Sequence, residues 1–156
     1  MRMCLIAVGT RMPAWVKAGF DEYAVRFPRE CPLQLLEIPA GKRGKQGGIE
    51  RLVREEGERI LAAVPKGARL IALDVGGRQW NTEQLAFELA HWRQEGRDLA
   101  LMIGGPDGLD SACRSRAELT WSLSRLTLPH PLVRIIVAEQ LYRALSLLNQ
   151  HPYHRG

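Results

Sequence analysis

Short apolar runs alternate with segments of helical periodicity along the whole chain. Met3 to Val8 is an uninterrupted apolar run that ends at Gly9, as expected of a strand buried on both faces. Further strands are expected at 33–38, 69–75, 98–103 and 120–126. Helical spacing of apolar residues is found in 13–27, 49–64 and 81–96, and a short helix is expected at about 110–118. This alternation predicts an α/β fold with a mainly parallel sheet flanked by helices.

Three loops at the carboxyl ends of predicted strands are candidates for a ligand site. They cover 73–77, 103–108 and 124–131, and ligands of parallel α/β folds bind at that edge of the sheet. The usual phosphate motifs are absent: 41–43 does not complete GxxxxGK[ST], and the run GGPDG lacks the GxGxxG spacing and its acidic partner. Kinase, NTPase and dehydrogenase activities are therefore disfavoured. A plain strand-to-helix turn explains GGPDG equally well.

The last third of the chain has the least ordinary pattern. Pro129 and Pro131 bracket His130, so this backbone is stiff and is expected to become helical only past Pro131. A stiff loop can present its N–H and C=O groups to a flat heterocycle such as adenine, although it can also be a simple turn before a helix. From 132 to 148, twelve of seventeen residues are apolar, which places this helix in the core or in a subunit interface.

The few polar residues of that helix, and the tail after it, are candidates for chemistry. Glu139 and Arg143 are an i,i+4 pair that forms either a simple helix ion pair or a substrate-facing one. The tail 151–155 reads HPYHR and offers two imidazoles, a phenol and a guanidinium, which suit an RNA base and its phosphate better than they suit packing. His130 is either a general base or a structural residue at a helix start. No Ser-His-Asp set, Cys-His set or carboxylate pair emerges from the spacing.

Composition changes this picture only slightly. The chain has 22 Lys and Arg against 17 Asp and Glu, a formal charge of +5 that favours a polyanionic partner without proving one. The glycine-rich basic loop 40–48 is expected to be mobile. The three cysteines are far apart in apolar surroundings and predict neither a disulfide framework nor a zinc site. No signal peptide or membrane-spanning run is apparent, so a cytoplasmic location is expected.

Several of these segments together resemble a known family. The runs IGGPDG, SLSRLTLPHPLVRIIVAEQLYRA and the terminal HPYHR, with AVGTRMPAWV and EIPAGKRGK, closely resemble the SPOUT methyltransferases that act on large-subunit ribosomal RNA. The resemblance spans nearly the whole chain. It implies one domain over 1–156, an α/β knot with a C-terminal trefoil knot, and a homodimer. The implied reaction moves a methyl group from S-adenosylmethionine to N3 of pseudouridine 1915, in helix 69 of 23S rRNA within the assembled ribosome, without a metal.

The same resemblance assigns expected roles to individual residues. It places the cofactor against the three candidate loops, at Leu73, Gly104, Gly105, Ser124, Arg125, Leu126, Thr127, Leu128 and Pro129. Around the target base it places His130, Glu139 and Arg143, with Glu139 or His130 as the proton acceptor. RNA contact is expected from Tyr153, His154 and Arg155 of the tail, which reaches a site made by the partner subunit. Independently of the resemblance, Lys42 and Arg43 of the basic loop are expected to bind RNA phosphates. Two alternatives stay open, a non-catalytic RNA- or ribosome-binding protein and a methyltransferase of transfer RNA.

Overall fold

A five-stranded parallel sheet forms the centre of the molecule. The computed structural model describes residues 1–42 and 48–155. Its strands are β1 (Met3–Val8), β2 (Leu33–Ile38), β3 (Arg69–Arg78), β4 (Leu99–Ile103) and β5 (Leu119–Trp121). Its helices are α1 (Ala14–Ala24), α2 (Gly48–Ala63), α3 (Thr82–Glu95), α4 (Ser111–Arg116), α5 (His130–Leu148) and the short 3₁₀ helix η1 (Pro152–Arg155). The strand order β2-β1-β4-β3-β5, with parallel pairing throughout, confirms the predicted α/β class.

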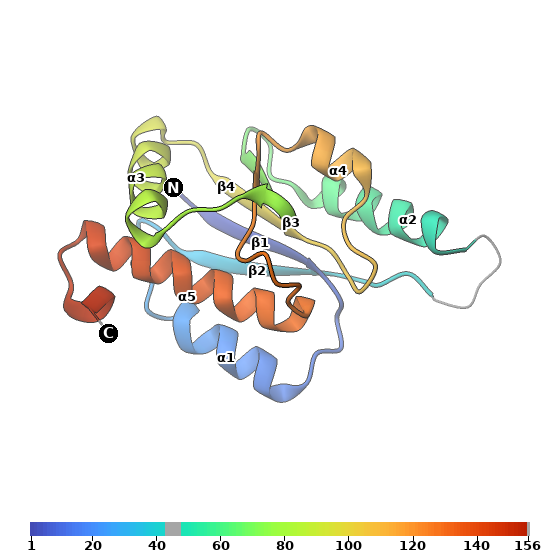
Figure 1. The fold of residues 1–156 in the computed structure, drawn as a ribbon, viewed down its shortest axis with the longest axis horizontal. Coiled ribbons are helices and arrows are strands. Elements are labelled where there is room, and N and C mark those ends of the chain that lie inside the picture. Colours follow the sequence, from blue (N-terminus) through green and yellow to red (C-terminus); the bar gives the residue numbers. More distant parts are fainter. Residues whose placement is uncertain (43–47, 156) are drawn as a thin grey trace.

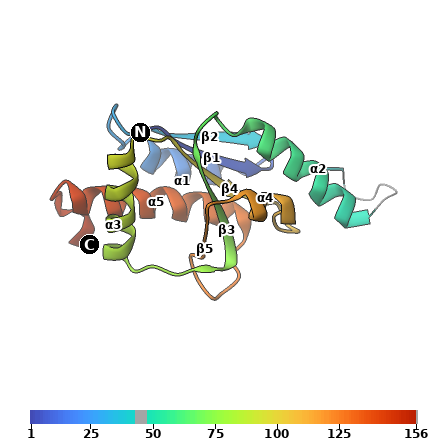
Figure 2. The ribbon, with the colours of Figure 1, turned by 90° about the horizontal axis from the view of Figure 1, so that it is seen from above.

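Helices cover both faces of the sheet. Alternate residues of β1 point to opposite faces, so Leu5 packs in a cluster with α1, α3 and α5, while Ile6 packs in a second cluster with α2 and α4. Figures 1 and 2 show the same division, with α1 and α5 side by side on one face and α2 and α4 together on the other. The fully apolar sequences of β1 and β4 are thereby explained, because every residue of these two strands is buried.

The edge of the sheet around β5 differs from the prediction. The strand expected at 120–126 ends at Trp121, because the chain then turns and the Ser122 hydroxyl donates to the carbonyl of Ser124 at 2.9 Å. β3 does not end at its glycines either but continues to Arg78, with an irregular register against β5. A Cβ on Gly77 would lie 2.7 Å from the carbonyl carbon of Thr120. Glycine here permits close strand approach and does not terminate the strand.

The last helix begins earlier than predicted. α5 starts at His130, with Pro129 as its N-cap residue, so the expectation that helix begins only past Pro131 was wrong. Proline lacks an N–H, but N–H groups of the first helical turn have no partner within the helix, so Pro131 costs nothing there. The proline bracket is therefore the entry into the helix as well as part of the preceding loop.

α5 lies in the core, which is one of the two positions predicted from its apolar sequence, the other being a subunit interface. Its most buried residues are at most 1 % exposed: Arg134, Val137, Ala138, Leu141, Ala144 and Leu145. The buried Arg134 is paired, as its guanidinium donates to Glu37 at 2.7 Å and to the carbonyls of Gly9 at 2.7 Å and Val8 at 3.1 Å. This set of bonds fixes the first half of α5 against the carboxyl ends of β1 and β2.

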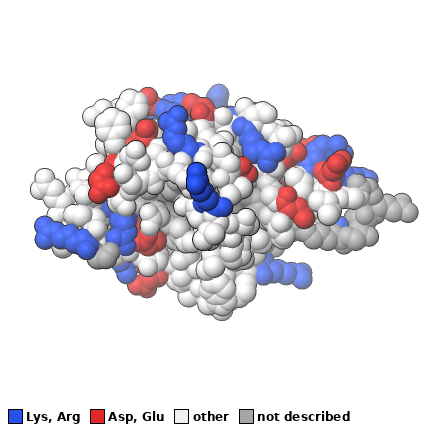
Figure 3. All heavy atoms as spheres, in the orientation of Figure 1, with Lys and Arg blue, Asp and Glu red and all other residues white. Residues whose placement is uncertain are grey.

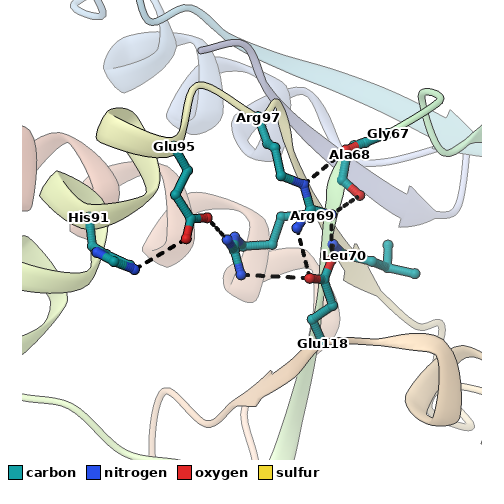
Figure 4. Close-up of polar contacts among 8 residues, drawn as sticks. All are labelled: Gly67, Ala68, Arg69, Leu70, His91, Glu95, Arg97 and Glu118. Carbon is teal, nitrogen blue, oxygen red and sulfur yellow. Dashed lines mark hydrogen bonds and ion pairs between the residues drawn. The ribbon is translucent and has the colours of Figure 1, made fainter.

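An ionic network lies at the amino ends of β3 and β4, as Figure 4 shows. Arg97 makes two hydrogen bonds to the carboxylate of Glu118, at 2.7 and 2.9 Å, and this pairing lowers the pKa of Glu118. Arg69 is paired with both Glu95 and Glu118, and His91 lies 3.2 Å from Glu95. The network joins the end of α3 to the strands, at the end of the sheet opposite to the candidate loops.

Candidate functional site

A pocket of about 580 Å³ lies between the middle of β3, the carboxyl end of β4 and the start of α5. Its walls come from all three loops that the sequence singled out. The predicted cofactor residues that line it are Leu73, Gly104, Gly105, Ser124, Leu126, Thr127, Leu128 and Pro129. Arg125 is exposed and does not line it. Its size and mainly apolar walls are typical of sites for small organic ligands.

The GGPDG turn shapes one wall of this pocket. A Cβ on Gly104 would lie 2.4 Å from the carbonyl carbon of Gly108 and 2.7 Å from the nitrogen of Leu109, which no backbone could accommodate. Gly108 has a φ of +84° and donates its N–H to the carbonyl of Gly105 at 3.0 Å. The glycines therefore close a tight turn and also keep its backbone open to the pocket.

The opposite wall is the loop between β5 and α5. Ser122 is buried and donates to the carbonyl of Ser124, and the Ser124 hydroxyl accepts the N–H of Leu126 at 2.9 Å. These two bonds hold the loop in shape without regular secondary structure. Leu126 is 74 % exposed, so a large apolar side chain stands at this wall without a partner from the rest of the described chain.

Two ionisable side chains line the pocket. Asp74 follows directly on Leu73, accepts the N–H of Gly76 at 3.0 Å and lies 3.9 Å from Arg114. His130 closes the pocket at the first turn of α5. The sequence identified His130 but not Asp74, although Asp74 lies within the predicted loop 73–77. Leu109, Trp121, Leu123 and Val133 also line the pocket and were not foreseen.

A second group of side chains lies on the middle of α5, where the tail folds back onto it, and is called the tail cluster: Glu139, Gln140, Arg143 and Tyr153. Arg143 donates to the carboxylate of Glu139, with nitrogen–oxygen distances of 2.6 and 2.8 Å, and Gln140 donates to it at 2.6 Å. The Tyr153 hydroxyl donates to the same carboxylate at 3.0 Å. Burial, with the hydrogen bond to Glu139 as the next cause, raises the pKa of Tyr153 to about 12. The i,i+4 pair expected from the sequence is thus present, and the tail supplies a third member.

The pocket and the tail cluster occupy different parts of the chain. α5 spans about 27 Å at 1.5 Å per residue, with His130 at one end and the tail at the other. Figure 1 shows the short helix of the tail folded back beside the far end of α5, away from its start. The structure therefore brings Glu139, Arg143 and Tyr153 together but leaves His130 with the cofactor loops. In the tail, His154 is half-buried and Arg155 is exposed.

The remaining candidate residues give little further support for a binding or catalytic site. Lys42 is exposed beyond the end of β2, while Arg43 and most of the basic loop expected to be mobile lie outside the described residues. The three cysteines are buried, and burial raises the pKa of Cys4 and Cys113 to about 11, which makes them poor nucleophiles. Across 1–42 and 48–155, no group of three His, Cys, Asp or Glu side chains is placed to hold a metal. Over the same ranges no helix is both long and apolar enough to cross a bilayer.

Comparisons with known proteins show the family of this chain. Residues 1–154 match the family model described as a predicted SPOUT methyltransferase. The chain is 60 % identical over 155 residues to the ribosomal RNA large subunit methyltransferase H of Methylococcus capsulatus, covering 99 % of this chain and all of that protein. A probable methylase family protein from Haemophilus influenzae shares the fold, with a TM-score of 0.55 at 13 % identity over 97 % of this chain and 69 % of its own. The chain belongs to the SPOUT methyltransferase family.

Proposed function

We propose that this protein transfers a methyl group from S-adenosylmethionine to N3 of pseudouridine 1915, in helix 69 of 23S rRNA on the assembled ribosome. The observation that carries the proposal is the pocket between β3, the end of β4 and the start of α5, which unites the three loops against which the resemblance places the cofactor. The 60 % identity to a relative named as a large-subunit rRNA methyltransferase supports the substrate. A ribosomal substrate in turn supports a cytoplasmic location.

The residues of the pocket suit this cofactor. The stiff run 126–129 offers backbone N–H and C=O groups and apolar side chains to an adenine ring, and the open backbone at Gly105 allows close approach from the other side. Asp74 supplies a carboxylate, which suits a ligand that carries hydroxyl groups and positive charge. When bound, S-adenosylmethionine supplies a methyl carbon made electrophilic by a sulfonium.

The chain's main task is to hold two reactants in line. In methyl transfer, a bond forms between N3 and the methyl carbon while the carbon–sulfur bond breaks, and the N3 proton leaves. Near-attack positioning can contribute roughly 7–11 kcal/mol, whereas a general base contributes about 10²–10⁴-fold, or roughly 3–5 kcal/mol. Residues that place the RNA base should therefore matter more than the residue that takes the proton.

The geometry favours His130 over Glu139 as the proton acceptor. The Glu139 carboxylate already accepts hydrogen bonds from Gln140, Arg143 and Tyr153, which occupy its oxygens. His130 faces the pocket in which the methyl group would lie. We assign Glu139 to orienting Arg143 and Tyr153 toward the RNA, and we assign His154 and Arg155 to RNA contact beside them.

A homodimer would reunite the two separated parts of the site. On the face formed by α1 and α5, Trp15 is 56 % exposed and Leu132 37 % exposed, and the two helices approach closely where Gly19 meets Ile135. Figure 3 shows few charged side chains over this lower middle part of the surface. A second copy packed there would place its tail cluster near the pocket of the first, which one chain alone cannot do across the length of α5.

The trefoil knot of the family also belongs to the proposal. The Gly104–Gly108 turn and the loop 122–129 form opposite walls of one pocket, and the chain then continues directly into the buried helix α5. This juxtaposition is compatible with a terminal segment threaded past an earlier loop. Single-molecule stretching tests it, because a knot shortens the fully extended chain relative to its contour length.

Two measurements test the proposed function. Calorimetric titration with S-adenosylmethionine should give saturable binding, and mass mapping of ribosomes methylated in vitro should place one methyl group in helix 69. Salt-sensitive RNA binding without cofactor binding would instead indicate a non-catalytic ribosome-binding protein. Methylation of transfer RNA in place of ribosomes would indicate the other alternative. Efficient methylation of a protein-free helix 69 hairpin would contradict the requirement for the assembled ribosome.

A further inference from the structure

An arginine outside the family motifs lies among aromatic rings around the tail cluster. Arg26 follows the end of α1, and its guanidinium carbon lies 5.1 Å from the ring centroid of Tyr23, 5.7 Å from that of Tyr142 and 5.5 Å from that of Tyr153. All three distances are within the range of a cation–π interaction. These rings come from α1, α5 and η1, so one side chain connects three elements that are distant in sequence.

Arg26 is itself held in place from α1. Its Nε donates to the carbonyl of Glu22 at 3.1 Å, and a terminal nitrogen donates to the Glu22 carboxylate at 2.8 Å. The side chain is only 35 % exposed, although it lies at the surface. Because Glu22 engages two of the nitrogens, the planar guanidinium has a fixed orientation toward the rings.

The position of the tail depends on contacts with α1 and α5 such as those made by Arg26. A four-residue 3₁₀ helix has little stability of its own, so contacts with α1 and α5 must fix η1. The Tyr153 ring lies edge-on to Tyr142 with centroids 4.8 Å apart, and Arg143 lies 5.0 Å from the Tyr153 centroid. Arg26 and Arg143 thus both hold this ring, while the Tyr153 hydroxyl reaches Glu139.

We propose that Arg26 is a positioning residue for methylation, which acts by holding the ring of Tyr153 and thereby the whole tail. The inference rests on the proposed function, in which the tail meets the RNA base. It assigns Arg26 an action through Tyr153 and not a direct contact with an RNA phosphate, because Glu22 and the tyrosine rings already surround its guanidinium.

A double-mutant cycle tests the path of action. Single-turnover methylation of ribosomes is measured for Arg26→Met, Tyr153→Ala and the double variant. Arg26→Met should slow methylation roughly 10-fold, as expected from the loss of several cation–π contacts. The double variant should be no slower than Tyr153→Ala alone, because Arg26 has then lost the ring through which it acts. Independent effects that multiply in the double variant would overturn the proposal.

A matched control removes the same charge nearby. Arg29 is an exposed arginine in the same connection between α1 and β2, and no contact between it and the tail is found among the described residues. Arg29→Met should therefore leave the rate within about twofold of the wild type, since it changes only the long-range charge. Equal losses in Arg26→Met and Arg29→Met would show that net charge, and not tail position, matters.

A measurement that does not depend on methylation separates this inference from the proposed function. Carboxypeptidase release of the terminal residues, followed by mass spectrometry, should be faster in Arg26→Met than in the wild type and unchanged in Arg29→Met. The affinity for S-adenosylmethionine should stay unchanged, and the melting temperature should fall by no more than about 4 °C, since the lost cation–π contacts are few and lie at the surface. If the wild type methylates no ribosomes, the proposed function fails while faster tail release still supports the contact. Unchanged tail release in Arg26→Met would overturn the inference whatever the activity.

Discussion

The two parts of the candidate site, one at each end of α5, are built from different chemical groups. At the start of α5, the pocket is built from backbone turns and apolar side chains, with Gly104 and Pro129 setting its shape. Past its middle, the tail cluster is built from side chains alone, with Glu139, Arg143 and Tyr153 joined by hydrogen bonds and ring contacts. The shape of the first part is set by backbone turns, whereas the second depends on a short terminal segment staying docked.

This difference follows from the ligands that the two parts would bind. A small cofactor is recognised by a preformed cavity, which loses no conformational freedom on binding. A base within a large RNA must be met by groups that project from the surface, such as phenol and guanidinium. Changes at the two ends of α5 should therefore affect different steps, cofactor binding at the start of the helix and RNA methylation at the tail.

The largest effect is expected from loss of the tail. Deleting 153–156 removes Tyr153 and Arg155 but touches no residue of the pocket. Methylation of ribosomes should fall more than about 100-fold, since misplacement of a reacting group by about 1 Å already costs that much. Affinity for S-adenosylmethionine, measured by calorimetry, should stay within about twofold. A large loss of cofactor affinity would show that the two ends are not separate.

A change in the pocket should give the opposite result. Gly104→Ala places a Cβ 2.4 Å from the carbonyl carbon of Gly108, so the turn must open and cofactor affinity should fall roughly 10- to 100-fold. Gly67→Ala is the matched control, because Gly67 also has a positive φ and its Cβ meets open space, but it does not line the pocket. Tail release by carboxypeptidase should not change in either variant. Equal losses of cofactor affinity would contradict the role of the close contact at Gly104.

The sequence predicted the sheet and the pocket better than the tail cluster. A buried strand such as Met3–Val8 can be recognised from its own run of apolar residues. The three candidate loops could be chosen because ligands of parallel α/β folds bind at the carboxyl ends of the strands, and all three line the pocket. The errors at Gly77 and Pro131 arose from contacts or context that a local pattern does not contain. Gly77 does not end β3, because the strand passes close to Thr120 of β5 there. Pro131 is helical, because it lies within the first turn of α5.

The surroundings of the tail could not be predicted at all from spacing. Glu139 and Arg143 were found because they are four residues apart on one helix. Arg26 lies 127 residues before Tyr153 in the chain, and only the packing of α1 against α5 brings them together. Nothing in the sequence around Arg26 distinguishes it from the exposed Arg29.

A smaller effect is expected when Glu139 loses its charge. The raised pKa of Tyr153, about 12, means that the neutral phenol is favoured in the folded state. Its contribution to stability is present below the ordinary tyrosine pKa of about 10 and is lost as the pH rises through about 12. In Glu139→Gln, ultraviolet titration should show the pKa of Tyr153 moving down toward its ordinary value, and methylation should fall more than cofactor affinity. An unchanged titration would exclude the hydrogen bond between Tyr153 and Glu139.

The smallest effect is expected at the amino end of the sheet, which serves neither part of the site. Glu118→Gln breaks the pairing with Arg97, but both side chains are about 40 % exposed, so the pair should contribute no more than about 1 kcal/mol. The melting temperature should fall by less than about 4 °C at neutral pH. Because Arg97 lowers the pKa of Glu118, this contribution is present above the ordinary carboxyl pKa and disappears as the pH falls, so the two proteins should converge in acid. Cofactor affinity and methylation should both match the wild type, since a change in either would mean that the amino ends of the strands influence the loops at their carboxyl ends.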